Sequence, residues 1–301
     1  MLFEPFGESS EKLHLQSLDI LGHVYYLHGF FDYSKVALME GVDGGHLKHL
    51  RISRYHARRT EPITLQGDWQ DYRSIESLAV DGISLPSRGS SWDEISARLT
   101  HLSINQFISE LGGTFSALRT LAMTTPISPA QLPIREIRDL CPLLEQLAYA
   151  QVPGLFTRDL PDLEDLPHLR RLYILAVLGS SYVEDYFARF MEYCTQTESN
   201  LFDRLDRFAA GATVCDIVTV RQLEWSLRLS LKVKEEIPGN EEADPKPYIP
   251  LLPIGVPAAQ LPRQTTFSFR GKVLRELDWG QLKQDPIVDT VRYYYDAKYK
   301  C

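Results

Sequence analysis

The chain has few cysteines, no excess of basic charge and no long apolar run, and each absence excludes a class of protein. Its 301 residues include 4 cysteines, at positions 141, 194, 215 and 301, which are too widely spaced for a disulfide framework. Acidic residues outnumber basic ones by 40 to 32, which disfavours a general nucleic-acid binder. The densest apolar stretch, Tyr173 to Leu178, is far too short to cross a bilayer.

The first residues also lack the basic and then apolar pattern of a secretory signal, since Leu2 to Glu11 is mixed and acidic. We therefore expect a cytoplasmic and/or nuclear protein with reduced thiols and no membrane partner. Hydrophobic residues make up 44% of the chain, enough to bury a sizeable core. Leucine is in clear excess, at 42 residues, and this excess calls for a search for internal repeats.

A phrase of the form leucine-x-x-leucine-x-apolar recurs along the chain. Six successive copies begin at Leu47, Ile75, Leu99, Leu118, Leu144 and Leu169. Their starts are 19 to 28 residues apart, around the pitch of about 20 to 29 residues that is typical of leucine-rich repeats. A further copy begins at Leu15, and a late one begins at Leu274.

This phrase predicts a short strand whose fourth and sixth residues point inward. One such unit cannot bury its apolar face alone, so neighbouring units must stack and share a core. We predict an α/β fold, an irregular leucine-rich-repeat-like solenoid over residues 1–180. Residues 181–301 would form C-terminal repeats and a helical and mixed cap, with an acidic, proline-rich loop at about 235–263. The alternative is an α-helical protein in which amphipathic helices produce the phrase by coincidence.

The segments between the strands are expected to close each unit. Residues 91–96 resemble a capped helix start, and residues 134–140 place apolar side chains at helical intervals after a proline. Two amphipathic helices are expected over residues 182–195 and 201–208, and strict alternation predicts a strand at 227–233. Residues 265–269 and the late phrase indicate that the chain re-enters the fold.

The sequence resembles the leucine-rich-repeat half of F-box/leucine-rich-repeat proteins, particularly the fungal type. The segments that carry the resemblance are residues 141–147, in which a cysteine-proline pair precedes the repeated phrase, and residues 166–172. The likeness covers roughly residues 45–180. Members of that family act as substrate-recognition subunits of ubiquitin ligases, and an N-terminal F-box docks the ligase's adaptor subunit. The first 40 residues hold no recognisable F-box, so we expect adaptor binding only if an F-box lies upstream.

Motifs for catalysis or metal binding are weak. No serine lies in the Gly-x-Ser-x-Gly elbow of a hydrolase, and the glycine-rich segments 41–45 and 111–113 fit turns, not phosphate loops. His46, His49 and His56 lie close in sequence, but no carboxylate or cysteine is expected to complete a zinc set with them. The carboxylates of residues 162–165 fit a solvated acidic loop. We predict no enzyme activity, metal or cofactor.

The third, fifth and seventh phrase positions should point outward, onto the concave face of the sheet. The predicted partner-binding residues on this face are His49, Arg51, His101, Asn105, Gln146, Arg171 and Tyr173. Small residues between them would form a floor that a partner can approach closely. The basic run over residues 48–59 fits a charged edge, a docking patch for an acidic partner or, least well, a nucleic-acid contact.

These patterns favour a non-enzymatic protein-recognition scaffold with a protein partner on the concave sheet. One form of it is the substrate-recognition part of a ubiquitin-ligase specificity subunit. The alternative is an enzyme whose site is assembled from scattered residues of an α/β fold, with the proline-rich residues 246–263 as a lid.

Overall fold

The central element of the fold is an 11-stranded sheet. The structure is a computed structural model, and it describes residues 14–23, 31–32, 37–38, 43–55, 63–64, 69–81, 83–85, 90–127, 131–151, 162–176, 190, 200–210, 213–219, 268–269 and 272–277. In spatial order the strands are β1 (Ser17–His23), β4 (His49–Tyr55), β6 (Ser77–Asp81), β8 (His101–Ile104), β9 (Thr120–Ile127), β10 (Gln146–Gln151), β11 (Arg171–Ala176), β12 (Arg207–Ala210), β13 (Thr213–Thr219), β15 (Lys272–Glu276) and β14 (Ser268–Phe269).

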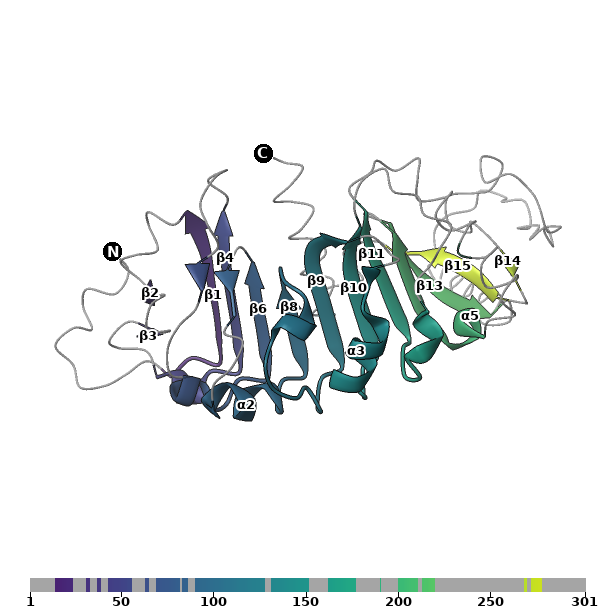
Figure 1. Cartoon of the computed structure of the whole chain (residues 1–301). Helices are drawn as coiled ribbons and strands as arrows, with labels where there is room; N and C mark the ends of the chain where they lie inside the picture. Colours follow the sequence, from purple (N-terminus) through teal and green to yellow (C-terminus); the bar gives the residue numbers. More distant parts are fainter. Residues whose placement is uncertain are drawn as a thin grey trace, which may run out of the picture.

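From β1 to β12 the strands stand side by side in chain order and pair in parallel (Figure 1). The pairs β12–β13, β13–β15 and β14–β15 are antiparallel. Two small sheets accompany this one, β2 (Phe31–Asp32) with β3 (Ala37–Leu38) and β5 (Ile63–Thr64) with β7 (Ile83–Ser84). The fold is therefore a mixed α/β arrangement dominated by one long sheet.

The connections carry short helical segments near the amino ends of the strands (Figure 1). The α-helices are α2 (Ser90–Ser96), α3 (Ile134–Leu140) and α5 (Leu201–Arg204), and the 3-10 turns are η2 (Gly44–His46), η3 (Trp69–Tyr72), η4 (Ile108–Glu110) and η6 (Leu163–Asp165). The helices predicted at 91–96 and 134–140 are confirmed, and Pro133 caps the second of them. The predicted turn at 111–113 is also present, where Gly113 takes a positive φ of 100° beside Ser96.

A repeated pair of hydrogen bonds sets the register of the parallel strands. The carbonyl oxygen of Gln16, at the second phrase position, accepts from the Lys48 nitrogen at 2.9 Å and from the His49 nitrogen at 3.0 Å. The same pair is accepted by the carbonyl oxygens of Lys48, Glu76, Thr100, Arg119, Glu145 and Arg170. Equivalent phrase positions therefore lie side by side across every junction from β1 to β12.

This register places the fourth and sixth phrase positions in two continuous buried rows. Nearly all of their members are at most 2% exposed, for example Leu50, Leu78, Leu102, Leu121, Leu147 and Leu172 in the fourth-position row and Ile52, Val80, Ile104, Met123, Tyr149 and Ile174 in the sixth-position row. Full burial of one such side chain is worth roughly 1.5 to 3 kcal/mol. The predicted inward orientation of both positions is confirmed.

Aromatic residues of the connecting segments extend this core below the sheet. Trp69 of η3 lies 5.4 Å from Trp92 of α2, and Trp92 lies 6.4 Å from Phe115, measured between ring centroids. The indole N–H of Trp92 donates to the Gly112 carbonyl oxygen at 2.8 Å, so its one polar atom is satisfied. The three rings join successive connections just as the leucine rows join successive strands.

The array of phrases is longer than the six successive copies. The phrase at Leu15 forms β1, and an eighth phrase begins at Leu205 and forms β12. The amphipathic helix predicted over residues 201–208 is therefore present only in its first half, as α5, which ends at Arg204; the second half is wrong, because Phe208 lies on a strand. Apolar residues three apart fit both a helix and the phrase, and the backbone pairing of Asp206 with Arg170 selects the phrase.

The sheet continues across residue 180, where we placed a boundary between the array and the cap. The late phrase does re-enter the fold, as β15, but it runs antiparallel to β13 and so is not a further repeat. The helix predicted at 182–195, apart from the helical residue 190, the strand at 227–233 and the acidic, proline-rich loop at 235–263 lie outside the described residues.

The buried rows give a direct test of the register. Leu121→Asp places an unpaired carboxylate in the fourth-position row and should destabilise the fold by about 3 to 5 kcal/mol. Leu143→Asp is the matched control, since Leu143 is 42% exposed and the same substitution there should change little. Thermal melts followed by circular dichroism measure both variants. Equal melting temperatures for Leu121→Asp and the wild type would contradict the inward register.

Candidate functional site

The register that turns two phrase positions inward also aligns two positions on the opposite side of the sheet, which we call the outward face. Its third-position row is Ser17, His49, Ser77, His101, Thr120, Gln146, Arg171 and Arg207. Its fifth-position row is Asp19, Arg51, Ala79, Ser103, Ala122, Ala148, Tyr173 and Ala209. The face predicted from the phrase therefore exists as a continuous surface of aligned side chains.

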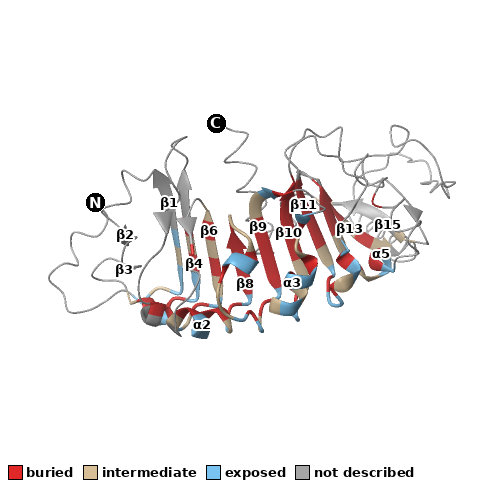
Figure 2. Cartoon of the chain, in the orientation of Figure 1, coloured by how far each residue is buried: buried red, intermediate tan, exposed pale blue. Residues whose placement is uncertain are grey.

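Access to this face changes along the sheet. In the fifth-position row Asp19 is exposed and Arg51 is half-buried, whereas every member from Ser103 to Ala209 is buried (Figure 2). The buried part of the face forms a second apolar cluster, made of Ala122, Ala148, Ala150, Tyr173, Leu175, Ala209 and Val214. The expected open floor of small residues is wrong over β9 to β12, because those residues are core.

Tyr173 is the clearest correction among the predicted binding residues. It is fully buried, and its register neighbours on both sides are alanines, Ala148 and Ala209, which leave space for its ring. The Arg207 guanidinium donates a hydrogen bond to the Tyr173 hydroxyl, and its Nε donates to Asp216 Oδ1 at 2.8 Å. Burial alone would lower the pKa of Arg207, but these bonds raise it. Tyr173 is thus part of the core and not an accessible contact.

His101 is the second correction, since it is 6% exposed and not open on the face. Burial first, and then the neighbouring Arg51 and His49, together lower the pKa of His101 to about 4. The imidazole is therefore neutral at physiological pH. Its Nδ1 atom is buried and has no hydrogen-bond partner.

The remaining predicted residues keep partial access. His49 is exposed, whereas Arg51, Asn105, Gln146 and Arg171 are half-buried. The Oδ1 atom of Asn105 and the Oε1 atom of Gln146 are buried and, like His101 Nδ1, have no hydrogen-bond partner. A buried polar atom left unsatisfied costs about 1 to 3 kcal/mol, so water or a bound group is expected at these atoms.

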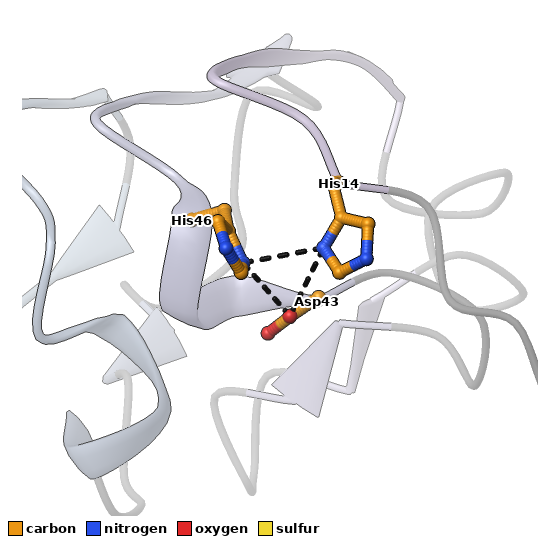
Figure 3. A group of neighbouring side chains, drawn as sticks. All are labelled: His14, Asp43 and His46. Carbon is orange, nitrogen blue, oxygen red and sulfur yellow. Dashed lines mark hydrogen bonds and ion pairs between the residues drawn. The ribbon is translucent and has the colours of Figure 1, made fainter.

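A separate cluster of side chains lies before the first two long strands. His14 precedes β1, Asp43 directly precedes η2, and His46 is the last residue of η2 (Figure 3). Asp43 Oδ2 lies 2.9 Å from His46 Nδ1 and 3.2 Å from His14 Nδ1, and the two imidazole nitrogens are 3.2 Å apart. The Gly45 N–H donates to Asp43 Oδ1 at 2.9 Å. The pKa of Asp43 is lowered mainly by this hydrogen bond and, to a smaller extent, by the hydrogen bond with His46.

This cluster was not predicted from the sequence. The expectation that no carboxylate joins His46 is wrong, because Asp43 lies beside it. His49 lies outside the cluster on the sheet, and His56 is outside the described residues. A usable signal was present, because His14 and His46 each directly precede the first apolar residue of a phrase. Equivalent positions of adjacent phrases lie side by side, so the repeat itself predicts that the two histidines meet.

Groups suited to catalysis are less well arranged in the described part of the chain. Cys141 and Cys215 are both buried, and burial raises the pKa of the Cys141 thiol to about 12. A buried neutral thiol is a poor nucleophile. In the acidic segment 162–165, Asp165 lies 4.0 Å from both Arg135 and Arg138. This segment therefore behaves as a surface charge network.

None of the described helices is both long and apolar enough to span a membrane. Comparisons of the chain with models of protein families, with curated proteins and with solved structures found no match.

The buried imidazole of His101 predicts a pH dependence of stability. The unfolded chain takes up a proton at this group near pH 6.5 and the folded chain only near pH 4, so between these values the unfolded state binds more protons. The free energy of unfolding should therefore fall, by about 3 kcal/mol in all, as the pH is lowered through this window.

Urea titrations at pH 7 and pH 4.5 measure this loss in the wild type and in His101→Gln. The variant should lose markedly less stability than the wild type, whereas the exposed control His168→Gln, which is not among the groups acting on His101, should lose as much as the wild type. Equal losses in the wild type and His101→Gln would contradict a buried, neutral His101.

Proposed function

We propose that this chain is a non-enzymatic protein-recognition scaffold with the architecture of an irregular leucine-rich-repeat-like solenoid. Support for the architecture comes from eight aligned phrases, from Leu15 to Leu205, that share one hydrogen-bond pattern at each junction. Stacked units of this kind expose one long face, which suits the binding of an extended surface. The free, buried thiol of Cys141 fits the reducing cytoplasm or nucleus.

The observation that carries the proposal is the change along the outward face. From β8 to β12 the chain itself buries the fifth-position row of this face, so a partner is expected where the face is polar and accessible, from β1 to β6. Arg51 and His49 lie at the centre of that part, in register with Asp19 and Ser17 on one side and with the residues of β6 on the other.

The buried polar atoms of His101 and Asn105 lie at the inner border of this region. Arginine is favoured at protein interfaces because its guanidinium offers several directed donors beside an apolar stem. The recognition surface that we propose is therefore centred on the accessible His49 and Arg51, and the half-buried Asn105 and the buried His101 mark its inner border. Arg171 and Gln146 border the covered part of the face.

The role of a ubiquitin-ligase specificity subunit rests on the resemblance of residues 45–180 to F-box/leucine-rich-repeat proteins. In that role, the partner bound on the outward face would be the substrate. Depletion of this protein in cells should then lengthen the lifetime of the bound partner. An unchanged lifetime would leave the scaffold without a ligase function.

Paired substitutions test the recognition surface. We expect His49→Ala/Arg51→Ala to lose proteins that the wild type captures, whereas Arg135→Ala/Glu136→Ala, on exposed positions of α3, should keep them. Removal of a central interface residue commonly costs about 2 kcal/mol, or roughly thirtyfold in affinity. Quantitative mass spectrometry of captured proteins, followed by titration of the purified partner, measures the effect.

Circular dichroism must show that both double variants are folded. Deletion of residues 239–244 tests the acidic loop as the alternative surface. Partners lost on this deletion and kept by His49→Ala/Arg51→Ala would move recognition from the sheet to the loop.

A further inference from the structure

The cluster of His14, Asp43 and His46 is built by the backbone of two neighbouring phrases. The β1–β4 register pairs Ser17 with His49, and the Gln16 carbonyl accepts from Lys48 and His49. The same offset of 32 residues places His14 opposite His46. Adjacent strands lie about 4.8 Å apart, which is close enough for two imidazoles at equivalent positions to face one another.

The backbone of η2 holds the carboxylate of the cluster in place. Asp43 precedes η2, and its Oδ1 atom accepts from the Gly45 N–H, so Oδ2 remains directed at the histidines (Figure 3). The turn itself is fixed, because the Ser74 hydroxyl donates to the Gly45 carbonyl oxygen and the Leu47 N–H donates to the Gly44 carbonyl oxygen. A side chain at residue 45 would press on the carboxylate, since a Cβ there would lie 3.1 Å from Oδ1.

The three converging atoms form a triangle with sides of 2.9, 3.2 and 3.2 Å. A single ion placed about 1 Å above this triangle lies about 2.1 Å from all three atoms, which is the usual distance from zinc to imidazole nitrogen and carboxylate oxygen. The three angles at such an ion, about 87°, 99° and 99°, are closer to octahedral than to tetrahedral values. The three ligand atoms already lie close enough together to share one ion.

The chemistry of the three ligand atoms restricts which metal ions can bind here. Two neutral imidazoles and one carboxylate suit divalent transition metals, whereas calcium and magnesium prefer oxygen ligands alone. The histidine side chains are 63% and 61% exposed, so an ion can enter and a water molecule can complete its coordination.

We propose that His14 Nδ1, His46 Nδ1 and Asp43 Oδ2 bind one divalent transition-metal ion of the zinc class, with water in the remaining position. The ion links the segment before β1 to the turn before β4, so it fastens the first phrase to the second. The site lies at the amino ends of the strands and is separate from the outward face. Its presence does not depend on the proposed recognition function.

Isothermal titration of the metal-free full chain with Zn²⁺ tests the proposal. The wild type should bind one ion at this site, and His14→Ala and His46→Ala should each weaken that binding by at least about tenfold. Asp43→Asn keeps the shape of the side chain and should also weaken binding, because it removes the ligand charge. His49→Ala is the matched control, since it removes an exposed histidine three residues from His46 and should bind as the wild type does.

Co²⁺ provides a second measurement that does not depend on stability. The wild type and His49→Ala should give the visible absorption of nitrogen- and oxygen-bound Co²⁺, and His14→Ala should not. Hydrogen exchange should also slow in β1 when Zn²⁺ is added to the wild type. Equal zinc affinity in the wild type and His14→Ala, or loss of binding in His49→Ala, would overturn the site and leave only an exposed hydrogen-bonded trio.

Discussion

The pair of hydrogen bonds accepted by one carbonyl at each phrase junction is the constraint on which the rest of this structure depends. It recurs from Gln16 to Arg170 and holds equivalent positions of neighbouring phrases opposite one another. Because side chains alternate along a strand, a slip of one residue would exchange the leucine rows with the outward face. The fixed register therefore decides the core, the outward face and the meeting of His14 with His46 together.

Side chains at the same second position reinforce this register. Lys48 and Glu76 pair at 3.0 Å, Arg119 pairs with Glu145, and Arg170 and Asp206 lie 3.7 Å apart. Each exposed pair contributes at most about 1 kcal/mol, so the pairs add little to the stability of the sheet. Their value lies in specificity, because a register shifted by one residue would separate these opposite charges.

The outward face differs in burial and polarity between the two ends of the array. At the far end of the array the fifth position holds alanine and tyrosine, and these side chains form a second core in place of a binding surface. At the near end Asp19 and Arg51 keep the same position polar and accessible. One repeated position thus belongs to the core in one half and is accessible in the other. The polar atoms of His101 and Asn105 mark the border between the halves.

The sequence by itself determined the phrase, the inward rows and which residues share the outward face, because these follow from local alternation along each strand. It also contained the pairing of His14 with His46, once the phrase at Leu15 is treated as part of the array. Only the tertiary structure decided that His101 and Tyr173 are buried, that Asp43 joins the histidines, and that Leu205 begins a strand phrase and not a helix. Periodicity assigns a side chain to a face, whereas the burial of that face depends on contacts between residues far apart in the chain.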